Sequence, residues 1–451
     1  MLTRIEIDGF KTFDRFALDL APFVAIAGVN AAGKSNLFDA IRFLSRLADN
    51  DLRSAVTGLR GDPAEVFRRR GDGSREHRIS LAVEVLLEPS IRDPWGTEHE
   101  LKQTRIRYEL ELEEREAEHG LPRLYVTHES AVPIRASSDS WARQAEVSQA
   151  FRQRYLHYRR QASFLETIAD LVRPEFKIAQ DSSQGRKRPA NAAEATVLSS
   201  ITSAEFVHLY ALRKELRSWR MLQLDPAALR EPSPYHAADE LEPSGANLPR
   251  VLARLRQETA DDANPDGVLG DVSADLAAII PGLEAMELRQ DEATKQWQVW
   301  FSSRGEAPFS SRVASDGTLR MLGLMAVLSD PTHGGLTCLE EPENGVHPAR
   351  LRTLISFLRD LVINPRRQDY GCGDPLIQLL VTTHSPVAVA ALDPGEGVYF
   401  DTATSVVPGE EPSLRTRARA IDRSLPLTEG GDAPVSQHEV EQYLATAVRA
   451  S

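Results

Sequence analysis

Apolar and polar positions follow two different periods along the chain, and together they predict a mixture of strands and helices. Residues 23–27 form a continuous apolar run suited to a buried strand, whereas 36–44 places its apolar residues at helical spacing. Similar short apolar runs at 335–339 and 376–381 predict further buried strands, and 321–328 predicts an apolar helix. Buried strands interleaved with helices indicate an α/β fold.

Other segments alternate between apolar and polar residues, as strands with one solvated face do. They are 79–87, 105–116, 124–129 and 297–301. We expect an antiparallel β subdomain beside the α/β core.

The middle of the chain returns to helical spacing, best at 141–172 and 204–224, and helix restarts at 246 after a Pro-, Ser- and acid-rich connection. It has no sustained heptad repeat, so we expect a compact helical lid rather than a coiled coil. The expected divisions are 1–137 for the first half of the core with the β subdomain, 138–268 for the inserted lid, 269–400 for the second half of the core, and 401–451 for a short tail.

Composition is that of a globular protein: 451 residues, 41% hydrophobic and 26% charged. No apolar run reaches the roughly 18 residues of a membrane span, and the first residues lack the layout of a signal peptide. The two cysteines, Cys338 and Cys372, imply neither a disulfide framework nor a zinc cluster. We therefore expect a cytoplasmic protein that does not contact a membrane.

The segment Gly28-Val-Asn-Ala-Ala-Gly33-Lys34-Ser35 fits the phosphate-loop pattern G-x-x-x-x-G-K-[ST]. It lies between the predicted strand 23–27 and the predicted helix 36–44, where backbone N–H groups and the helix N-terminus can surround phosphates. Lys34 would reach the β- and γ-phosphates, and Ser35 would bind Mg²⁺.

Two carboxylates, Glu340 and Glu341, follow the strand predicted at 335–339. Beside a phosphate loop, Glu340 can bind the metal and Glu341 can orient or deprotonate the attacking water, although a charged loop after a strand would have the same pattern. His384 follows the strand predicted at 376–381 and can hydrogen-bond the γ-phosphate and the attacking water.

Ser315 and Gly317 precede the apolar helix 321–328. They could face a phosphate at a helix N-terminus, but an ordinary helix cap explains them equally well.

Taken in order, these four motifs resemble the ABC-type ATPase head, most closely the branch that contains RecF, the OLD-family ATPases, the SMC-like heads and the ATPases of bacterial anti-phage systems. Residues 5–13 resemble the first strand and F-K-x-F turn of that branch, 340–348 its Walker B strand end and D-loop, 315–318 its short signature, and 382–386 its switch segment. The resemblance covers about residues 1–85 and 270–400.

The resemblance implies an enzyme that binds ATP with Mg²⁺ and hydrolyses it in a head-to-tail dimer. The implied nucleotide-binding residues are Lys11, Asn30, Gly33, Lys34, Ser35 and Asn36. Ser315 and Gly317 would act on the ATP of the partner subunit, and Asn344 and His347 would lie near the dimer seam. Family members usually carry a glutamine after the first helix that couples Mg²⁺ to the moving domain. Residues 36–90 contain no glutamine, so either a residue near Glu65 or Arg68 replaces it or the coupling differs.

Charge is uneven along the chain. The net charge is −13, yet residues 141–230 contain 15 Lys and Arg against 9 Asp and Glu, a net of +6. A basic patch there could follow the backbone of double-stranded DNA, or it could be an ordinary solvated helix face. The candidate DNA-contacting residues are Arg159, Arg160, Arg186, Lys187, Arg188 and Arg217.

After His384 only 67 residues remain, too few for the nuclease domain of OLD proteins, so we predict no intrinsic nuclease. Residues 437–450 are expected to form a small amphipathic docking helix. The resemblance favours an ATPase that controls a separate nuclease or toxin in anti-phage defence. A RecF-type repair ATPase, a transporter ATPase subunit and an ATP-binding scaffold without turnover are the alternatives, and Glu341 and His384 argue against the last.

Overall fold

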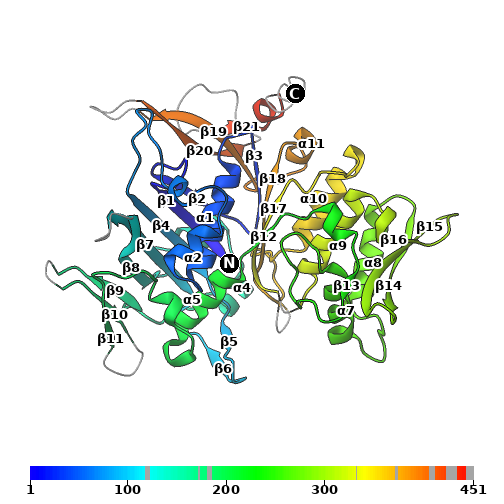
Figure 1. Ribbon diagram of the computed structural model, residues 1–451, viewed down its shortest axis with the longest axis horizontal. Coiled ribbons are helices and arrows are strands. Elements are labelled where there is room, and N and C mark those ends of the chain that lie inside the picture. Colours follow the sequence, from blue (N-terminus) through cyan, green and yellow to red (C-terminus); the bar gives the residue numbers. More distant parts are fainter. Residues whose placement is uncertain are drawn as a thin grey trace.

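Two large sheets with a long helix packed between them form the centre of the molecule (Figure 1). The computed structural model describes residues 1–116, 122–170, 173–179, 185–331, 333–370, 374–405, 412–422 and 434–442.

The first sheet is the parallel α/β sheet expected from the apolar runs. Its strand order is β12-β17-β18-β3-β19-β20-β21, parallel throughout except for the β19–β20 pair. The strands are β3 (Phe23–Gly28), β12 (Arg220–Leu222), β17 (Gly335–Glu340), β18 (Ile377–Thr383), β19 (Gly397–Ser405), β20 (Ser413–Asp422) and β21 (Val435–Ser436). Because Glu340 pairs with Thr382 and Thr383 pairs with Ala27, the ends of β17, β18 and β3 meet at one edge of the sheet.

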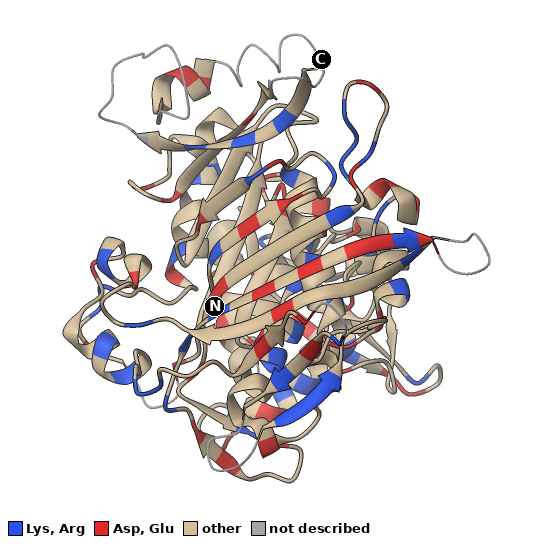
Figure 2. Ribbon diagram, turned by 90° about the vertical axis from the view of Figure 1, so that its left-hand side faces the viewer, with Lys and Arg blue, Asp and Glu red and all other residues tan. Residues whose placement is uncertain are grey.

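The second sheet is the expected antiparallel subdomain, in the order β11-β10-β9-β8-β7-β4-β1-β2. Its strands are β1 (Leu2–Asp8), β2 (Phe16–Asp19), β4 (Arg78–Leu86), β7 (Arg105–Glu116), β8 (Pro122–Pro133), β9 (Leu165–Ile168), β10 (Glu175–Ile178) and β11 (Arg186–Pro189). Figure 2 shows rows of charged residues along this sheet, which agrees with the alternation in the sequence.

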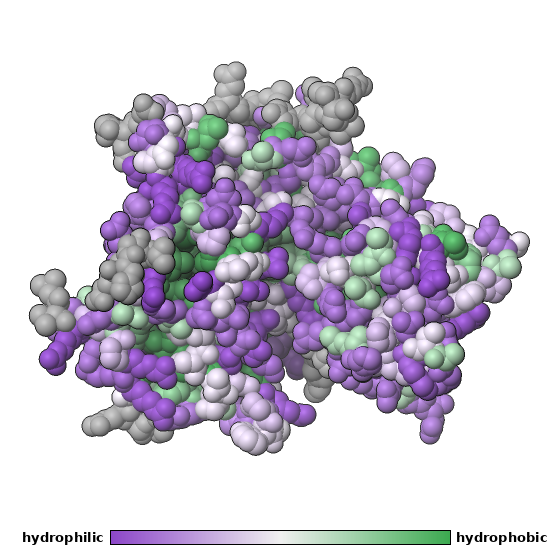
Figure 3. All heavy atoms as spheres, in the orientation of Figure 1, coloured by the Kyte–Doolittle hydropathy of each residue, from purple (hydrophilic) through white to green (hydrophobic). Residues whose placement is uncertain are grey.

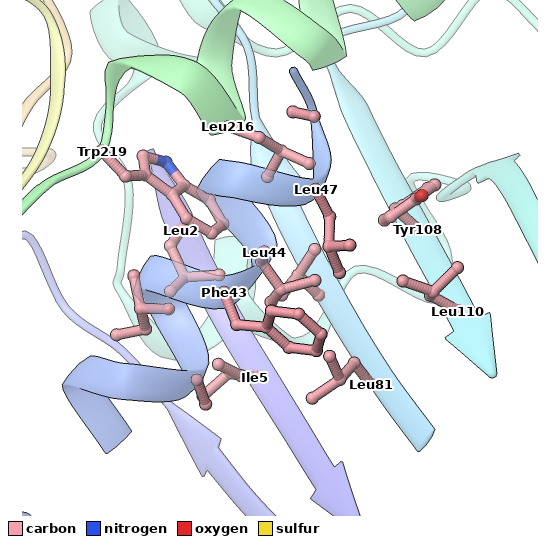
Figure 4. Close-up of a cluster of buried hydrophobic side chains, with 14 of the residues drawn as sticks. Leu2, Ile5, Phe43, Leu44, Leu47, Leu81, Tyr108, Leu110, Leu216 and Trp219 are labelled. Atoms are coloured by element: carbon pink, nitrogen blue, oxygen red, sulfur yellow. The ribbon is translucent and has the colours of Figure 1, made fainter. Parts of the chain in front are cut away.

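Helix α1 (Lys34–Leu47) joins the two sheets through its apolar residues. Phe43, Leu44 and Leu47 lie against Ile5 and Leu81 of the antiparallel sheet, as Figure 4 shows. The same buried cluster includes residues of β3, β17 and β18. Burying a large apolar side chain stabilises the fold by about 1.5–3 kcal/mol, so this packing holds α1 between the sheets, and with it the phosphate loop that precedes Lys34.

A second buried cluster covers the other face of the parallel sheet. It contains residues of four helices: α7 (Leu248–Thr259), α8 (Val268–Ile279), α9 (Asp316–Leu328) and α10 (Leu351–Asp360). It also contains residues of β14 (Leu283–Asp291) and β15 (Gln296–Ser303), which form a small sheet with β13 (Ser233–Pro234) and β16 (Phe309–Ser310). These elements form the yellow-green lobe of Figure 1.

The region predicted as a helical lid, 138–268, is mixed in the structure. The predicted helix 141–172 is wrong: it contains α3 (Ser140–Gln144), α4 (Gln149–Tyr155) and then β9. The helix expected at 204–224 is α5 (Val207–Ser218) followed by β12, and the loop expected at 181–189 includes β11. Backbone pairing places these strands in the sheets: β9, β10 and β11 extend the antiparallel sheet beyond β8, and β12 pairs with β17 at the edge of the parallel sheet. The remaining elements are α2 (Leu52–Thr57), α6 (Pro226–Leu229), α11 (Pro386–Val389), β5 (Ser90–Arg92) and β6 (Glu98–Glu100).

The segment expected to be a short tail contributes β20 and β21 to the parallel sheet. Residues 437–442 are helical, whereas the rest of the docking helix predicted to 450 lies outside the described residues, as does Cys372. Cys338 is buried in β17. None of the helices in the described part of the chain has the length and apolarity needed to cross a membrane.

Candidate functional site

The phosphate loop, residues 28–35, connects β3 to α1 as the sequence predicts. Ala31 and Gly33 adopt positive φ angles of 64° and 96°, which turn the backbone sharply before the helix begins. A Cβ atom at Gly33 would lie 2.1 Å from Oγ1 of Thr416, so only glycine fits beneath β20 at this position. Asn36 donates from Nδ2 to Oγ1 of Thr12 over 2.9 Å, while Asn30 is exposed.

Lys34 is buried at the start of α1. Its Nζ donates to the carbonyl oxygens of Gly28 and Val29, each over 2.8 Å. Burial lowers the pKa of Lys34 to about 8. The charges of three nearby carboxylates, Glu341, Glu340 and Glu343, act in the opposite direction and raise it. The expected carboxylates therefore do lie close to the phosphate-loop lysine.

Glu340 ends β17, and Glu341 follows it in a left-handed conformation with φ of 50°. Non-glycine residues seldom adopt this conformation, and they often do so at functional sites. The N–H of Glu341 donates to the carbonyl oxygen of Thr382 over 3.1 Å, which holds the turn against β18.

Glu341 and His384 form a pair across the ends of β17 and β18. Nε2 of His384 lies 3.3 Å from Oε1 of Glu341, and Nδ2 of Asn344 donates to Oε2 over 2.7 Å. The hydrogen bond from His384 is the main reason that the pKa of Glu341 is lowered to about 2. Glu341 is therefore a carboxylate at neutral pH, as an acceptor of a proton from water must be.

Lys11 lies near the phosphate loop, where its ammonium group forms an ion pair within the chain. Its Nζ is 2.5 Å from Asp39 of α1, which also pairs with Nε of Arg60 over 3.1 Å. Arg60 reaches further, to the carbonyl oxygen of Ser35 at 3.0 Å and to Glu340 at 3.5 Å. Sequence reasoning missed Arg60 because it falls in no motif considered; only the fold brings residue 60 beside the loop.

Gln223 was also missed, because it lies outside residues 36–90, where a coupling glutamine was sought. It directly follows β12, the parallel neighbour of the strand that carries Glu340 and Glu341. It lines a cavity of about 370 Å³ together with both carboxylates and Asn344. Sheet order, rather than sequence distance from α1, places this glutamine near the carboxylates.

Ser315 and Gly317 begin α9 as expected of a helix cap. The Oγ of Ser315 accepts from the N–H of Thr318 over 3.2 Å. A Cβ atom at Gly317 would lie 2.2 Å from the carbonyl oxygen of Gly345, so the signature (residues 315–318) packs directly against the segment that follows Glu341. His347 is exposed and accepts from the N–H of Ala349 over 3.2 Å. The cap is therefore observed, and a role toward a partner's ATP stays a prediction.

The candidate DNA-contacting residues have several partners within the chain. Arg186 and Lys187 of β11 pair with Glu205 and Glu175, each at 2.7 Å. Arg188 donates to Ser200, and Arg217 forms an ion pair with Asp49. Arg160 lies over the ring of Phe164, and Arg159 is exposed. The structure therefore gathers only 186–188 on one strand, seen as the blue edge strand of Figure 2.

Mg²⁺ is usually held by one or two protein oxygens, waters and the phosphates of its nucleotide. The hydroxyl of Ser35 and the carboxylate of Glu340 are ligands of this kind. Among the described residues no group of three or more His, Cys, Asp or Glu side chains could hold a metal ion alone. The residues present therefore fit a metal that arrives with a nucleotide.

A strand-bound phosphate loop, paired carboxylates and a histidine at one edge of a parallel sheet, beside an antiparallel subdomain, define a P-loop ATPase built as an ABC-type head. Residues 23–390 match the family model described as "AAA domain, putative AbiEii toxin, Type IV TA system". The chain belongs to this family, which confirms the expected ATPase class.

Known proteins with SMC heads are also similar to the chain. The Chromosome partition protein Smc of Methanocaldococcus jannaschii is 40% identical over 75 residues, which are 14% of this chain and 6% of that protein. An Smc head bound to the C-winged helix domain of ScpA is 12% identical with a TM-score of 0.49, covering 93% of this chain and 98% of that one. The SMC head from Thermotoga maritima is 12% identical with a TM-score of 0.38, covering 92% and 97%.

Proposed function

We propose that the chain hydrolyses ATP with Glu341 as the base that activates water. The observation that carries this proposal is the Glu341–His384 pair beside Lys34. Lys34 and the backbone N–H groups of the phosphate loop would bind the β- and γ-phosphates, and Ser35 and Glu340 would hold Mg²⁺. Gln223 would contact the metal from the neighbouring strand and couple it to the lobe of α7–α10.

We further propose that ATP joins two copies of the chain head to tail, each signature acting on the partner's nucleotide. Ser315 is exposed, and the neighbouring Val313 has 72% of its surface exposed, which is unusual for a large apolar residue. The face of the molecule drawn in Figure 3 is mainly hydrophilic, with scattered apolar patches. A partner's phosphate loop seated on the signature would cover this apolar residue, and loss of the γ-phosphate would release the two copies.

The biological role we propose is control of a separate effector, a nuclease or toxin, in anti-phage defence. Support comes from the family description, which names a toxin and a toxin–antitoxin system. An ATP-dependent change between one copy and two would give such control its switch. The expected cytoplasmic location belongs to the same proposal.

Turnover by single-site variants tests the enzymatic proposal. Glu341→Gln keeps the hydrogen-bonding shape but removes the base, so kcat should fall about 100-fold or more while ATP stays bound. Lys34→Ala should weaken ATP binding itself, because a buried cation for the phosphates is lost. ATP hydrolysis by Glu341→Gln at the wild-type rate would show that another group is the base.

DNA is a second candidate partner, and β11 is the observation that favours it. Every residue of Arg186–Pro189 is exposed, and Arg186 and Lys187 each have 59% of their side-chain surface exposed. Exposed ion pairs contribute only about 0–1 kcal/mol, so DNA phosphates could replace Glu205 and Glu175 as their partners.

Charge reversal of Arg186, Lys187, Arg188 and Arg217 to Glu tests this interface. If these side chains bind phosphates, DNA affinity should fall, and the slope of log affinity against log salt should become shallower by about one for each phosphate no longer neutralised. An unchanged affinity and an unchanged salt slope would exclude DNA binding through these residues.

A further inference from the structure

Glu343 is a largely buried carboxyl group that the proposed chemistry does not use. Its Oε1 accepts from the hydroxyl of Thr383 over 2.5 Å and from the N–H of His384 over 3.0 Å. Oγ1 of Thr383 accepts in turn from the N–H of Ser385 over 3.0 Å. One oxygen of Glu343 therefore anchors Thr383 and His384 directly, and Ser385 through Thr383, within the switch segment 382–386.

Glu341 and Glu343 contact His384 through different groups. The imidazole of His384 lies against Glu341, and the backbone N–H of His384 donates to Glu343, which follows Glu341 by two residues. The carbonyl oxygen of Glu343 accepts from the N–H of Val346 over 2.9 Å, so the anchoring residue is itself fixed in its turn. A shift of the Glu343 carboxyl group would thus move His384 relative to Glu341.

The second carboxyl oxygen of Glu343 differs from the first. Oε2 is buried and has no hydrogen-bond partner among the described residues. Burial raises the pKa of Glu343, and the neighbouring charge of Glu341 raises it further. Only Oε1 is used as an acceptor, and the amide oxygen of a glutamine would supply the same acceptor at this position.

We propose that Glu343 is a positioning residue for ATP hydrolysis, which holds the switch segment so that His384 stays against Glu341. This inference rests on the proposed function, since it assigns Glu343 a part in the hydrolytic step. Glu343 itself need not touch the nucleotide. Its loss should therefore lower kcat and leave the affinity for ATP nearly unchanged.

Three substitutions separate positioning from general stability. Glu343→Met keeps the length but removes the acceptor, and should lower kcat about 10- to 100-fold with the Kd for ATP within about twofold. Glu343→Gln keeps the acceptor and should restore most of the rate. Thr383→Val removes one donor and should give a smaller loss, which still tests the proposal if Glu343→Met does not fold.

A double-mutant cycle with His384→Ala gives the decisive readout. If Glu343 acts through His384, then Glu343→Met and Thr383→Val should lower kcat little further in the His384→Ala background. The proposal would be overturned if the loss of kcat from Glu343→Met multiplied that from His384→Ala in the double variant, or if Glu343→Met alone kept the wild-type kcat. Wild-type protein without any ATP turnover would instead refute the proposed function itself.

Glu129 provides a matched control. It is a buried carboxyl group in the antiparallel sheet that accepts from the N–H groups of Val197 and Leu198 over 2.6 and 3.0 Å. Glu129→Met removes an anchor of the same kind away from the phosphate loop. It should lower the melting temperature yet leave kcat within about twofold of wild type.

Discussion

At the scale of single residues, the site depends on two charged side chains whose pKa values are shifted well away from their ordinary values. Glu341 combines a left-handed backbone with a pKa near 2, and Lys34 is a buried ammonium with a pKa near 8. The sequence predicts these residues because their motifs are local: the phosphate loop and the carboxylates each lie within a few positions of a recognisable strand. It does not predict Arg60 or Gln223, because tertiary structure alone brings them to the site.

Two histidines away from the proposed chemistry should make stability depend on pH. Burial lowers the pKa of His333 and of His208 to about 4, against 6.5 when exposed. Between these values the unfolded chain binds more protons, so stability is complete above pH 6.5 and is lost as pH falls toward 4. Relative to pH above 6.5, each of the two histidines should lower the free energy of unfolding at pH 5 by up to about 2 kcal/mol.

Urea unfolding of wild type and His333→Gln at pH 7 and pH 5 checks this prediction. The substitution removes the titrating group and leaves an amide that can hydrogen-bond Thr337, whose Oγ1 lies 2.9 Å from Nε2 of His333. The variant should therefore lose less stability between the two pH values than wild type does. Glu129, whose pKa burial raises to about 7, acts in the opposite direction in both proteins, so an equal loss in wild type and variant would contradict the argument.

At the scale of elements, long periodic segments were predicted better than short ones. The strands β4 and β7 and the helices α1 and α9 have enough residues for their apolar period to be read, and β17 was recognised by its continuous apolar run. The four-residue strands β9, β10 and β11 are too short for that, and the helical interpretation of their region failed. Pairing with a neighbouring strand decided their conformation, which a single sequence does not reveal.

The packing of α9 against the segment after Glu341 gives a prediction at this scale. Gly317→Ala would bring a Cβ atom within 2.2 Å of the carbonyl oxygen of Gly345, so the signature must move away from that segment. We expect ATPase activity to fall about 10-fold or more with little change in the Kd for ATP of the single chain. Steady-state turnover and equilibrium binding measure the two quantities.

Gly323→Ala is the matched control on the same helix. Its Cβ atom would meet only side-chain atoms of Leu224 and Leu229, at 3.2–3.4 Å, and alanine favours helix. This variant should keep nearly full activity. Equal losses for the two substitutions would mean that α9 tolerates no added methyl group, and would remove the special role of Gly317.

At the scale of the whole molecule, the chain brings distant segments to one edge of the parallel sheet. The phosphate loop comes from β3 and α1, the carboxylates from β17, His384 from the end of β18, and β20 covers Gly33. The signature lies on the neighbouring lobe and packs against Gly345 of the segment after Glu341. This arrangement explains why a second copy of the chain is needed in our account to place a signature over the bound ATP.

The most direct test is the mass in solution of Glu341→Gln with ATP and Mg²⁺. The account predicts a mass of twice the 50.0 kDa chain with nucleotide, the single-chain mass without it, and no ATP-dependent dimer when Lys34→Ala is added. An effector bound in stoichiometric amount to protein purified from its native cells would raise the mass further and identify what the ATPase controls. Glu341→Gln that binds ATP and remains a single chain would contradict the ATP-joined dimer.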